Sequence, residues 1–218
     1  SIELYDHNNK FIYNVCSQSY FGVPSATVHT AAYTKYVFGT SPLRYDVAAV
    51  IEMLKHKQYR LKFTLNDLYS KNMDGKPIEY KGKSLTFIES VEMFIVMKCK
   101  YFGKGLCITP FAKLNNGYLD VFILKRTTRI KLIRLFLQLQ SMKHDLSALQ
   151  DPLITYFRCK SITIQPINDD GKIIKNSKLY NYPDVGIDGE IGYYLPLTIK
   201  VKQKSLPMFN YQYKSMFQ

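Results

Sequence analysis

The sequence predicts a mainly β domain of the α+β class, an antiparallel β-sandwich with a pair of helices covering one side. Short apolar and aromatic runs alternate with turn residues, and the 218 residues include 18 Tyr and 13 Phe but no Trp. Aromatic and β-branched residues favour strands, and many short strands indicate a sandwich or barrel. We expect residues 1–218 to form one domain, since the length suffices for a substantial core.

Most of the predicted elements are strands. Residues 59–65 and 197–202 alternate apolar and polar side chains, as strands with one buried face do. Residues 84–99 contain one or two further strands, whereas residues 66–83 are polar and indicate a loop or a hairpin insertion. Other strands are predicted at residues 11–16, 106–109, 118–124, 154–157 and 161–165.

Two segments have helical periodicity. Residues 43–55 follow Ser41 and Pro42, which suit the N-cap and the first helical position. Residues 128–140 carry apolar side chains at i, i+3, i+4 and i+7. By contrast, we expect Gly22 and Pro24 to break regular structure after the first predicted strand.

The composition restricts the partners and the cellular compartment. A formal net charge of +13 favours an anionic partner, which could be nucleic acid, an anionic lipid surface or a nucleotide. Zinc-finger spacing and the aromatic ribonucleoprotein signature are both absent from the sequence, so nucleic acid is not expected, although a basic nucleic-acid-binding β-domain stays an alternative. Four cysteines without a C-x-x-C pair suit reduced thiols in the cytoplasm. No apolar run reaches the roughly 20 residues that span a bilayer.

Three motifs, in this order, resemble the diacylglycerol, sphingosine and ceramide kinase family. The first runs from Tyr101 through the Gly103-Lys104-Gly105 turn and Pro110 to Ala112, and continues from Leu114 to Asp120. The second is the helical segment from Leu132 to Leu137 with Lys143-His144, and the third is Ile187-Asp188-Gly189-Glu190. Upstream, Leu43-Arg44-Tyr45-Asp46 is also similar to the family, so the resemblance covers nearly the whole chain.

The resemblance implies that this chain is the C-terminal, lipid-binding half of a lipid kinase. The family's Gly-Gly-Asp-Gly loop is absent here, and it belongs to a preceding nucleotide-binding domain. The implied reaction is ATP-dependent, Mg²⁺-requiring phosphorylation of a hydroxyl of a sphingoid base, ceramide or diacylglycerol. ATP and Mg²⁺ would be bound mainly by the preceding domain, so this chain alone is expected to be inactive. The acidic residue that contacts a sphingoid amine in the family is missing from residues 20–26.

The resemblance also assigns polar site residues. Glu190 and Asp188 are the candidate catalytic acids, and Asp188, Gly189, Glu190, Arg44 and Lys35 are the candidate nucleotide-binding residues. Arginine suits bidentate contacts with phosphate. The alternatives are an exposed turn between strands for the acids and solvated surface cations for Arg44 and Lys35.

Lipid contacts are expected on the second predicted helix and opposite it. A long apolar slot for an acyl chain would be lined by Phe122, Leu132, Leu135, Phe136, Leu139 and His144. The alternative is ordinary core packing, which such stripes usually represent.

Basic residues lie beside this apolar stripe and predict a contact with an anionic membrane surface. They are Arg126, Arg129, Lys131 and Arg134. We therefore expect a cytoplasmic protein that associates peripherally with membranes. A solvated charged face is the alternative for the helix, and a non-catalytic lipid-binding module is the alternative for the whole chain.

Overall fold

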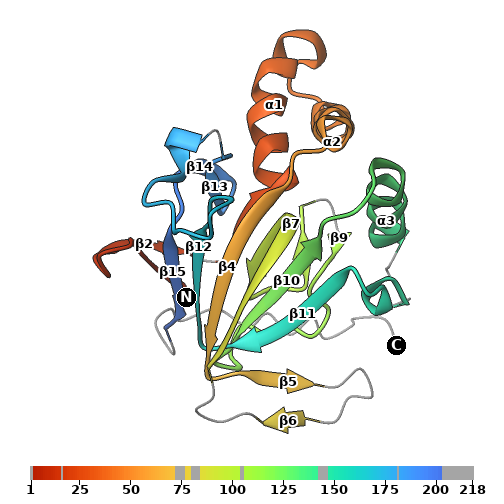
Figure 1. The fold of residues 1–218 in the computed structure, drawn as a ribbon. Coiled ribbons are helices and arrows are strands. Elements are labelled where there is room, and N and C mark those ends of the chain that lie inside the picture. The colour runs from red at the N-terminus through yellow and green to blue at the C-terminus, as the bar shows by residue number, and fades with distance from the viewer. Residues whose placement is uncertain are drawn as a thin grey trace, which may run out of the picture.

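Two β layers packed face to face form the body of the domain, and three helices lie on one outer face (Figure 1). The computed structural model describes residues 2–15, 17–71, 77–79, 84–103, 106–141, 147–180 and 182–202. All of the strand pairs in this part of the chain are antiparallel. The predicted sandwich is thus confirmed.

The two layers share one long strand, β7. The first layer has the order β11–β10–β7–β3–β13–β14 and the second the order β7–β4–β12–β15–β1–β2. The strands of the first layer are β11 (Ile154–Cys159), β10 (Leu119–Lys125), β7 (Leu85–Met97), β3 (Gln18–Gly22), β13 (Val185–Ile187) and β14 (Glu190–Tyr193). Those of the second are β4 (Tyr59–Asn66), β12 (Ser161–Pro166), β15 (Leu197–Val201), β1 (Ile2–Tyr5) and β2 (Phe11–Val15).

Strands β3 and β4 lie along the same edge of β7 and diverge at Glu92. Val91 pairs with Tyr59 of β4 on one edge and with Lys125 of β10 on the other. From Met93 onward, β3 takes the place of β4. The long strand therefore turns one sheet into two facing layers.

The space between the layers is filled by the larger of two hydrophobic cores. Each layer contributes alternate residues, such as Phe94 from β7 and Phe63 from β4, whose rings meet edge to face at 5.9 Å. The open ends of the path approach each other, since the rings of Tyr13 on β2 and Tyr193 on β14 lie 6.3 Å apart. The sheet consequently curls almost into a closed barrel.

The second core lies between the outer face of the first layer and the helices α1 (Val23–Phe38), α2 (Leu43–Lys55) and α3 (Arg129–Ser141). Met93, Ile95 and Met97 of β7 face this core, whereas Phe94 and Val96 face the barrel interior. This alternation is the period-two pattern of a strand that is buried on both faces.

Two small hairpins and two short 3₁₀ helices complete the fold. They are β5 (Tyr69–Lys71) with β6 (Pro77–Glu79), β8 (Tyr101–Phe102) with β9 (Leu106–Cys107), and the 3₁₀ turns Ser147–Gln150 and Ser177–Tyr180. The first hairpin confirms the predicted insertion at residues 66–83.

The two predicted helices are confirmed, but the expectation of a break after Gly22 was wrong. Helix α2 has the predicted bounds and α3 begins one residue later than predicted. Gly22 is instead the N-cap of the 16-residue α1, and Pro24 lies in its first turn. Proline is well tolerated there because the first N–H groups of a helix have no intrahelical partner.

Gly22 is required by both its backbone conformation and its surroundings. Its φ is +82°, and a Cβ at this position would lie 2.1 Å from the carbonyl oxygen of Glu92. Gly171 has a similar φ of +78° but open space around it. The two glycines therefore separate the cost of backbone strain from the cost of crowding.

We predict that Gly22→Ala destabilises the fold much more than Gly171→Ala does. The positive φ alone costs roughly 1–2 kcal/mol in either variant, and the crowding at Gly22 adds at least about 2 kcal/mol because backbone atoms must move. Urea unfolding of both variants measures the difference. Equal losses of stability would show that β7 can yield at Glu92.

Candidate functional site

The Asp188-Gly189-Glu190 motif forms the tip of the hairpin between β13 and β14. Asp188 and Gly189 are its two loop residues, with φ of +48° and +99°. A two-residue hairpin turn with positive φ at both positions is of the type that Asp-Gly sequences favour. The predicted turn is therefore present, at the edge of the first layer and exposed to solvent.

The Asp188 carboxylate anchors this turn to the start of β3. Its Oδ1 accepts hydrogen bonds from Ser17 N (3.0 Å), Ser17 Oγ (2.9 Å) and Gln18 N (3.0 Å). In return, the Asp188 N–H donates to the Gln18 carbonyl at 3.0 Å. One oxygen of this candidate catalytic acid is thus occupied by structural contacts.

Glu190 is the acid that the hairpin presents to solvent. It is the first residue of β14, pairs with Ile187 across the turn and is exposed. Within the described part of the chain, its carboxylate makes no hydrogen bond or ion pair. It is therefore available to a ligand or to another domain.

Tyr20 lies directly behind the hairpin. Its ring covers Gly186 of β13, where an added Cβ would lie 2.1 Å from the ring, and meets Phe102 edge to face at 5.2 Å. Burial, together with the nearby Asp188 and Glu190 charges, raises the pKa of the Tyr20 phenol to about 12, against a hydrogen bond from the backbone of Gly189. The phenol therefore stays neutral at physiological pH.

Arg44 lies in the first turn of α2 and is paired with Tyr45. Its Nη2 donates to the Tyr45 hydroxyl at 3.0 Å, and its guanidinium carbon is 4.8 Å from the centre of that ring. Its Nε is buried without a hydrogen-bond partner among the described residues. The Arg44 carbonyl accepts a hydrogen bond from Thr34 Oγ1 at 3.5 Å, so Arg44 lies beside the C-terminal half of α1.

Lys35 differs from Arg44 in its surroundings. It lies in the last turn of α1 with an exposed side chain, and its carbonyl accepts the Gly39 N–H at 2.8 Å. These features are those of a solvated cation at a helix C-terminus, where a positive charge is favourable.

The predicted lipid-binding residues come together in the second core. Phe122 of β10 and the α3 residues Leu132, Leu135 and Leu139 are buried there, with Phe136 partly buried against them. These side chains therefore lie together in the structure, while their contact with a lipid stays a prediction. His144 lies outside the described residues.

Comparison with known proteins gives the family. Residues 17–210 match the model of the YegS C-terminal NAD kinase beta sandwich-like domain. The chain belongs to this family. The match confirms the resemblance to C-terminal domains of lipid kinases that the sequence motifs indicate.

The solved structures that resemble this domain agree with the fold. Three solved structures of proteins assigned as diacylglycerol kinases from Bacillus anthracis strain Sterne have TM-scores of 0.56, 0.54 and 0.53. They share 16%, 18% and 18% identity with this chain and match 93% of its length. The chain spans about half of their length, 53%, 54% and 53% respectively. No curated protein matches the sequence.

Two absences apply to the described residues of this family member. No helix among them is both long and apolar enough to cross a membrane. The same residues contain no group of three or more His, Cys, Asp or Glu that could hold a metal ion.

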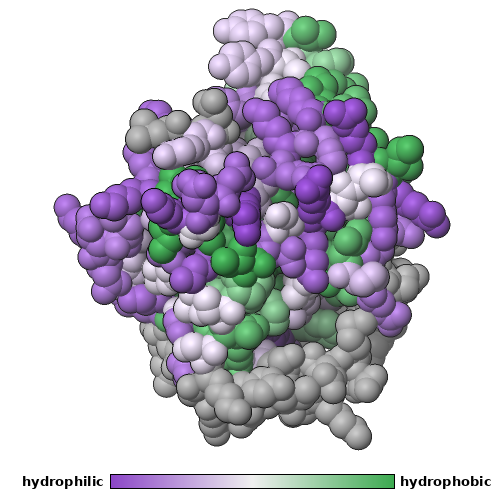
Figure 2. Space-filling view, viewed as in Figure 1, coloured by the Kyte–Doolittle hydropathy of each residue, from purple (hydrophilic) through white to green (hydrophobic). Residues whose placement is uncertain are grey.

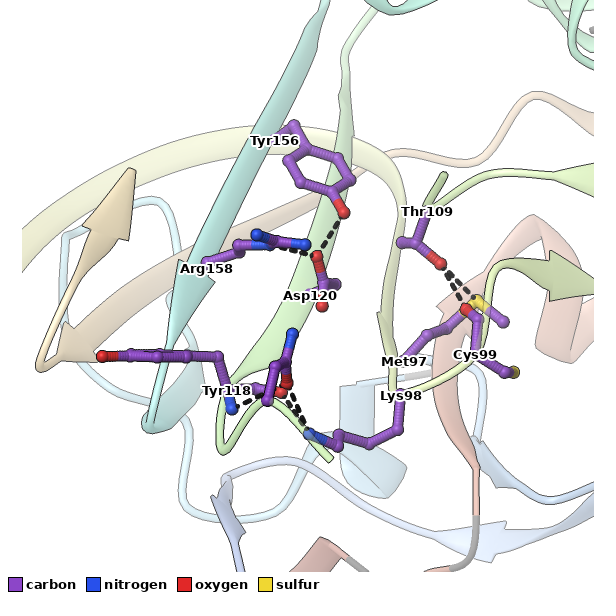
Figure 3. Close-up of polar contacts among 9 residues, drawn as sticks. Met97, Lys98, Cys99, Thr109, Tyr118, Asp120, Tyr156 and Arg158 are labelled. Atoms are coloured by element: carbon purple, nitrogen blue, oxygen red, sulfur yellow. Dashed lines mark hydrogen bonds and ion pairs between the residues drawn. The ribbon is translucent and has the colours of Figure 1, made fainter. Parts of the chain in front are cut away.

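A buried polar network lies at the opposite end of β10 from the helices (Figure 3). The Asp120 carboxylate accepts hydrogen bonds from the Tyr156 hydroxyl and from Arg158 Nε, the latter at 2.7 Å. Nearby, Lys98 Nζ donates to the Tyr118 carbonyl at 2.6 Å and to Asn116 Oδ1 at 2.9 Å. Lys98 thereby fixes the predicted Asn115-Asn116-Gly117 turn.

Asp120 supplies the negative charge that balances the two cations of this network. Asp120 is fully buried between two nearly buried cations, Lys98 and Arg158. Burial raises the pKa of Asp120, and hydrogen bonds from Tyr156 and Arg158 oppose the shift. Burial also lowers the pKa of Lys98, an effect that the charge of Asp120 counteracts.

Sequence reasoning missed three residues of the site region: Ser17, Tyr20 and Tyr45. Ser17 and Tyr20 act across 171 and about 170 positions of sequence, so no local pattern contains them. Tyr45 adjoins Arg44, and this adjacency was the one available signal.

We predict that Asp120→Asn lowers the free energy of unfolding by about 3 kcal/mol or more, because Arg158 and Lys98 stay buried without a counter-charge. Glu89→Gln, which removes the partly exposed Glu89–Lys125 pair at 3.8 Å, should change it by less than about 1 kcal/mol. Denaturant unfolding at neutral pH measures both. If the two variants lose similar stability, the network is not electrostatically essential.

Proposed function

We propose that the full-length protein is an ATP-dependent lipid kinase and that this chain is its lipid-binding half. The observation that carries the proposal is the position of Tyr20, whose ring is part of the helix-covered core and packs against Gly186 of β13, the strand that leads into the Asp-Gly-Glu turn. An acid and an apolar layer thus adjoin at one residue. An amphiphile with a polar head and an apolar tail requires this combination.

The second core is the proposed site of the lipid tail. It contains three methionines, Met53 of α2 and Met93 and Met97 of β7. Methionine side chains adapt to irregular shapes, which suits a layer that has to part around an acyl chain. Each buried methylene contributes about 0.8 kcal/mol, so a tail of ordinary length provides ample binding energy.

Glu190 is the proposed acid at the head group. In the reaction, the lipid hydroxyl gives up its proton and its oxygen bonds to the γ-phosphorus as the bond to ADP breaks. Phosphoryl transfer depends chiefly on positioning and charge neutralisation. Glu190 would assist by orienting the hydroxyl or by accepting a hydrogen bond from it, with Asp188 and Gly189 fixing its place.

ATP and Mg²⁺ fit the exposed groups as partial ligands. Mg²⁺ commonly takes one or two carboxylates and completes its coordination with phosphate oxygens and water. Glu190 can supply one carboxylate, and the partly exposed Arg44 can supply hydrogen bonds to phosphate oxygens from its guanidinium. The remaining contacts, the family's glycine-rich loop included, would come from a preceding nucleotide-binding domain.

We predict that the full-length protein transfers labelled phosphate from ATP to vesicles containing diacylglycerol, ceramide or sphingosine. Glu190→Gln should reduce kcat at least about tenfold, since a group acting in proton transfer contributes 10²–10⁴-fold and an orienting group less. Asp170→Asn is the control, because Asp170-Gly171 is a second exposed Asp-Gly turn in the chain.

The outcomes of this assay separate the alternatives. Transfer to one lipid identifies the substrate class and supports the kinase. Binding of lipid by folded protein without transfer to any of the three contradicts the kinase and favours a non-catalytic lipid-binding module. Salt-sensitive binding of oligonucleotides without a lipid preference would contradict both.

An anionic membrane surface is the proposed partner at which the lipid is met. Arg126, Arg129, Lys131 and Arg134 are all exposed, next to the exposed apolar Ile130 and Leu137. Figure 2 shows hydrophobic residues along the side of the α1–α2 hairpin that faces α3, and Leu43, Val50 and Leu54 of α2 are exposed as well. Basic and apolar groups side by side favour binding at an anionic interface.

We predict that Arg129→Glu with Arg134→Glu weakens binding to vesicles containing phosphatidylserine at least about tenfold, since each basic residue near such a surface contributes about 1 kcal/mol. The matched control is Lys172→Glu with Lys178→Glu, which makes the same charge change elsewhere on the surface. Vesicle sedimentation at two salt concentrations measures both. Equal weakening by the two pairs would mean that net charge, rather than α3, attracts the protein to the membrane.

A further inference from the structure

We propose that the gap between the two open edges of the sheet, at β2 and β14, binds a medium-chain carboxylate, a single acyl chain that ends in one negative charge. The gap uses none of the residues assigned above to the nucleotide or to the lipid substrate. The proposal is independent of the proposed function, because it requires a bound ligand but no phosphoryl transfer.

A cavity of about 380 Å³ that opens to solvent lies at this gap. Its lining comes from the β1–β2 turn, from β2, from the segment that precedes the Ser177–Tyr180 turn, and from β14 with its link to β15. Strands β2 and β14 are the two ends of the sheet path, and neither pairs with another described strand on its outer side. The volume is that of a small-molecule site.

The inner wall of the cavity is apolar and rigid. Leu195 and Leu197 are buried in the core of the barrel interior, and Ile12 and Tyr193 pack partly buried against the same core. The Leu195 N–H donates to Ser177 Oγ at 3.0 Å, and the Leu195 carbonyl accepts the Ser177 N–H at 3.0 Å. An acyl chain along this wall loses contact with water, and a preformed wall lowers the ordering cost of binding.

The rim of the cavity carries the groups that select the charge of the ligand. Asp6 is the one acid among the lining residues, and its Oδ1 already accepts the N–H groups of Asn8 at 2.9 Å and Lys10 at 2.8 Å. Lys175 and His7 are exposed on the rim, and the Lys175 ammonium makes no hydrogen bond or ion pair within the described part of the chain. One free ammonium matches a single carboxylate, whereas a phosphate dianion calls for more cations.

Strand β14 would also be contacted by a ligand in this cavity. Gly192 and Tyr193 line the cavity from β14, the strand that begins with Glu190. Gly192 is exposed, with open space where a Cβ would lie, so the backbone of β14 is accessible there. Two short strands are marginally stable by themselves, and β14 pairs with β13 at the end of the path. A bound ligand should therefore stabilise β14.

We predict that the full-length protein binds decanoate saturably, below the concentration of micelle formation. Decanol has the same tail without the charge and should bind at least about fivefold more weakly. Lys175→Glu should weaken decanoate binding at least about fivefold and change decanol binding less than about twofold, because attraction at short range becomes repulsion. Lys172→Glu is the matched control, an exposed lysine in the same segment that does not line the cavity, and should change neither. Isothermal titration calorimetry measures all of these affinities.

The position of the bound chain is measured directly, because the helix-covered core is a second place that can take up an acyl chain. A decanoate analogue with a diazirine near the end of its tail should label residues 6–13 or 192–197 on illumination, as mapped by mass spectrometry of peptides. Decanoate should also slow hydrogen–deuterium exchange in the peptide that contains Gly192 and Tyr193 in wild type, and at the same concentration less so in Lys175→Glu.

Three results would overturn the proposal. They are label confined to the three helices or to a preceding domain, equal loss of decanoate affinity in Lys175→Glu and Lys172→Glu, and decanol binding as tight as that of decanoate. None of these readouts involves phosphoryl transfer. Failure of the kinase assay and failure of this site are therefore distinguishable.

Discussion

The carboxylate of Glu92, fully buried in β7, accepts hydrogen bonds from the Thr127 N–H at 3.1 Å and from Gln58 at 3.3 Å, and lies 3.2 Å from His56 Nε2. Thr127 lies just before the start of α3, and His56 and Gln58 follow the end of α2. Burial raises the pKa of Glu92, and the hydrogen bonds and His56 only partly offset it. A buried acid therefore lies at the point where β3 and β4 diverge: its Oε1 contacts all three partners, whereas its Oε2 is buried without a hydrogen-bond partner among the described residues. Burial of its charge is costly.

The contacts of Glu92 explain where the three helices lie. The α1–α2 hairpin leaves the sheet at Gly22, against the Glu92 carbonyl, and returns at His56, against the Glu92 carboxylate. His56 ends α2 in a left-handed conformation, and its Nε2 also donates to the Thr127 carbonyl at 2.7 Å. Because both ends of the hairpin and the start of α3 meet at one residue, all three helices cover the same face of the first layer. The barrel interior remains a separate core, so the helix-covered face can change its packing without opening the barrel.

The sequence predicts elements with local signals and fails where the signal is ambiguous or distant. Residues 43–55 were predicted correctly because Ser41-Pro42 and the apolar spacing agree. Residues 23–38 were not, because Gly22 and Pro24 suit both a break and a helix start, and α1 buries little beyond Val23, Ser25 and Ala31. The Asp188-Gly189 turn was predictable from its two residues. Its contact with Ser17 and the packing of Tyr20 on β13 were not, because both arise only through the order β3–β13–β14, which pairs strands more than 160 residues apart.

Under the proposed function, the different roles of Asp188 and Glu190 explain why this domain would not form a complete active site by itself. Asp188 has one oxygen committed to Ser17 and Gln18, and Tyr20 is neutral, so Glu190 is the acid of the motif that faces solvent unpaired in the described structure. A single exposed carboxylate cannot hold Mg²⁺ and also neutralise a triphosphate, which requires cations. Arg44, the candidate phosphate-binding cation, lies beside Thr34 in the C-terminal half of α1. Under the proposed function, the remaining phosphate-binding groups would come from a preceding nucleotide-binding domain, facing the edge of the first layer where Glu190 begins β14.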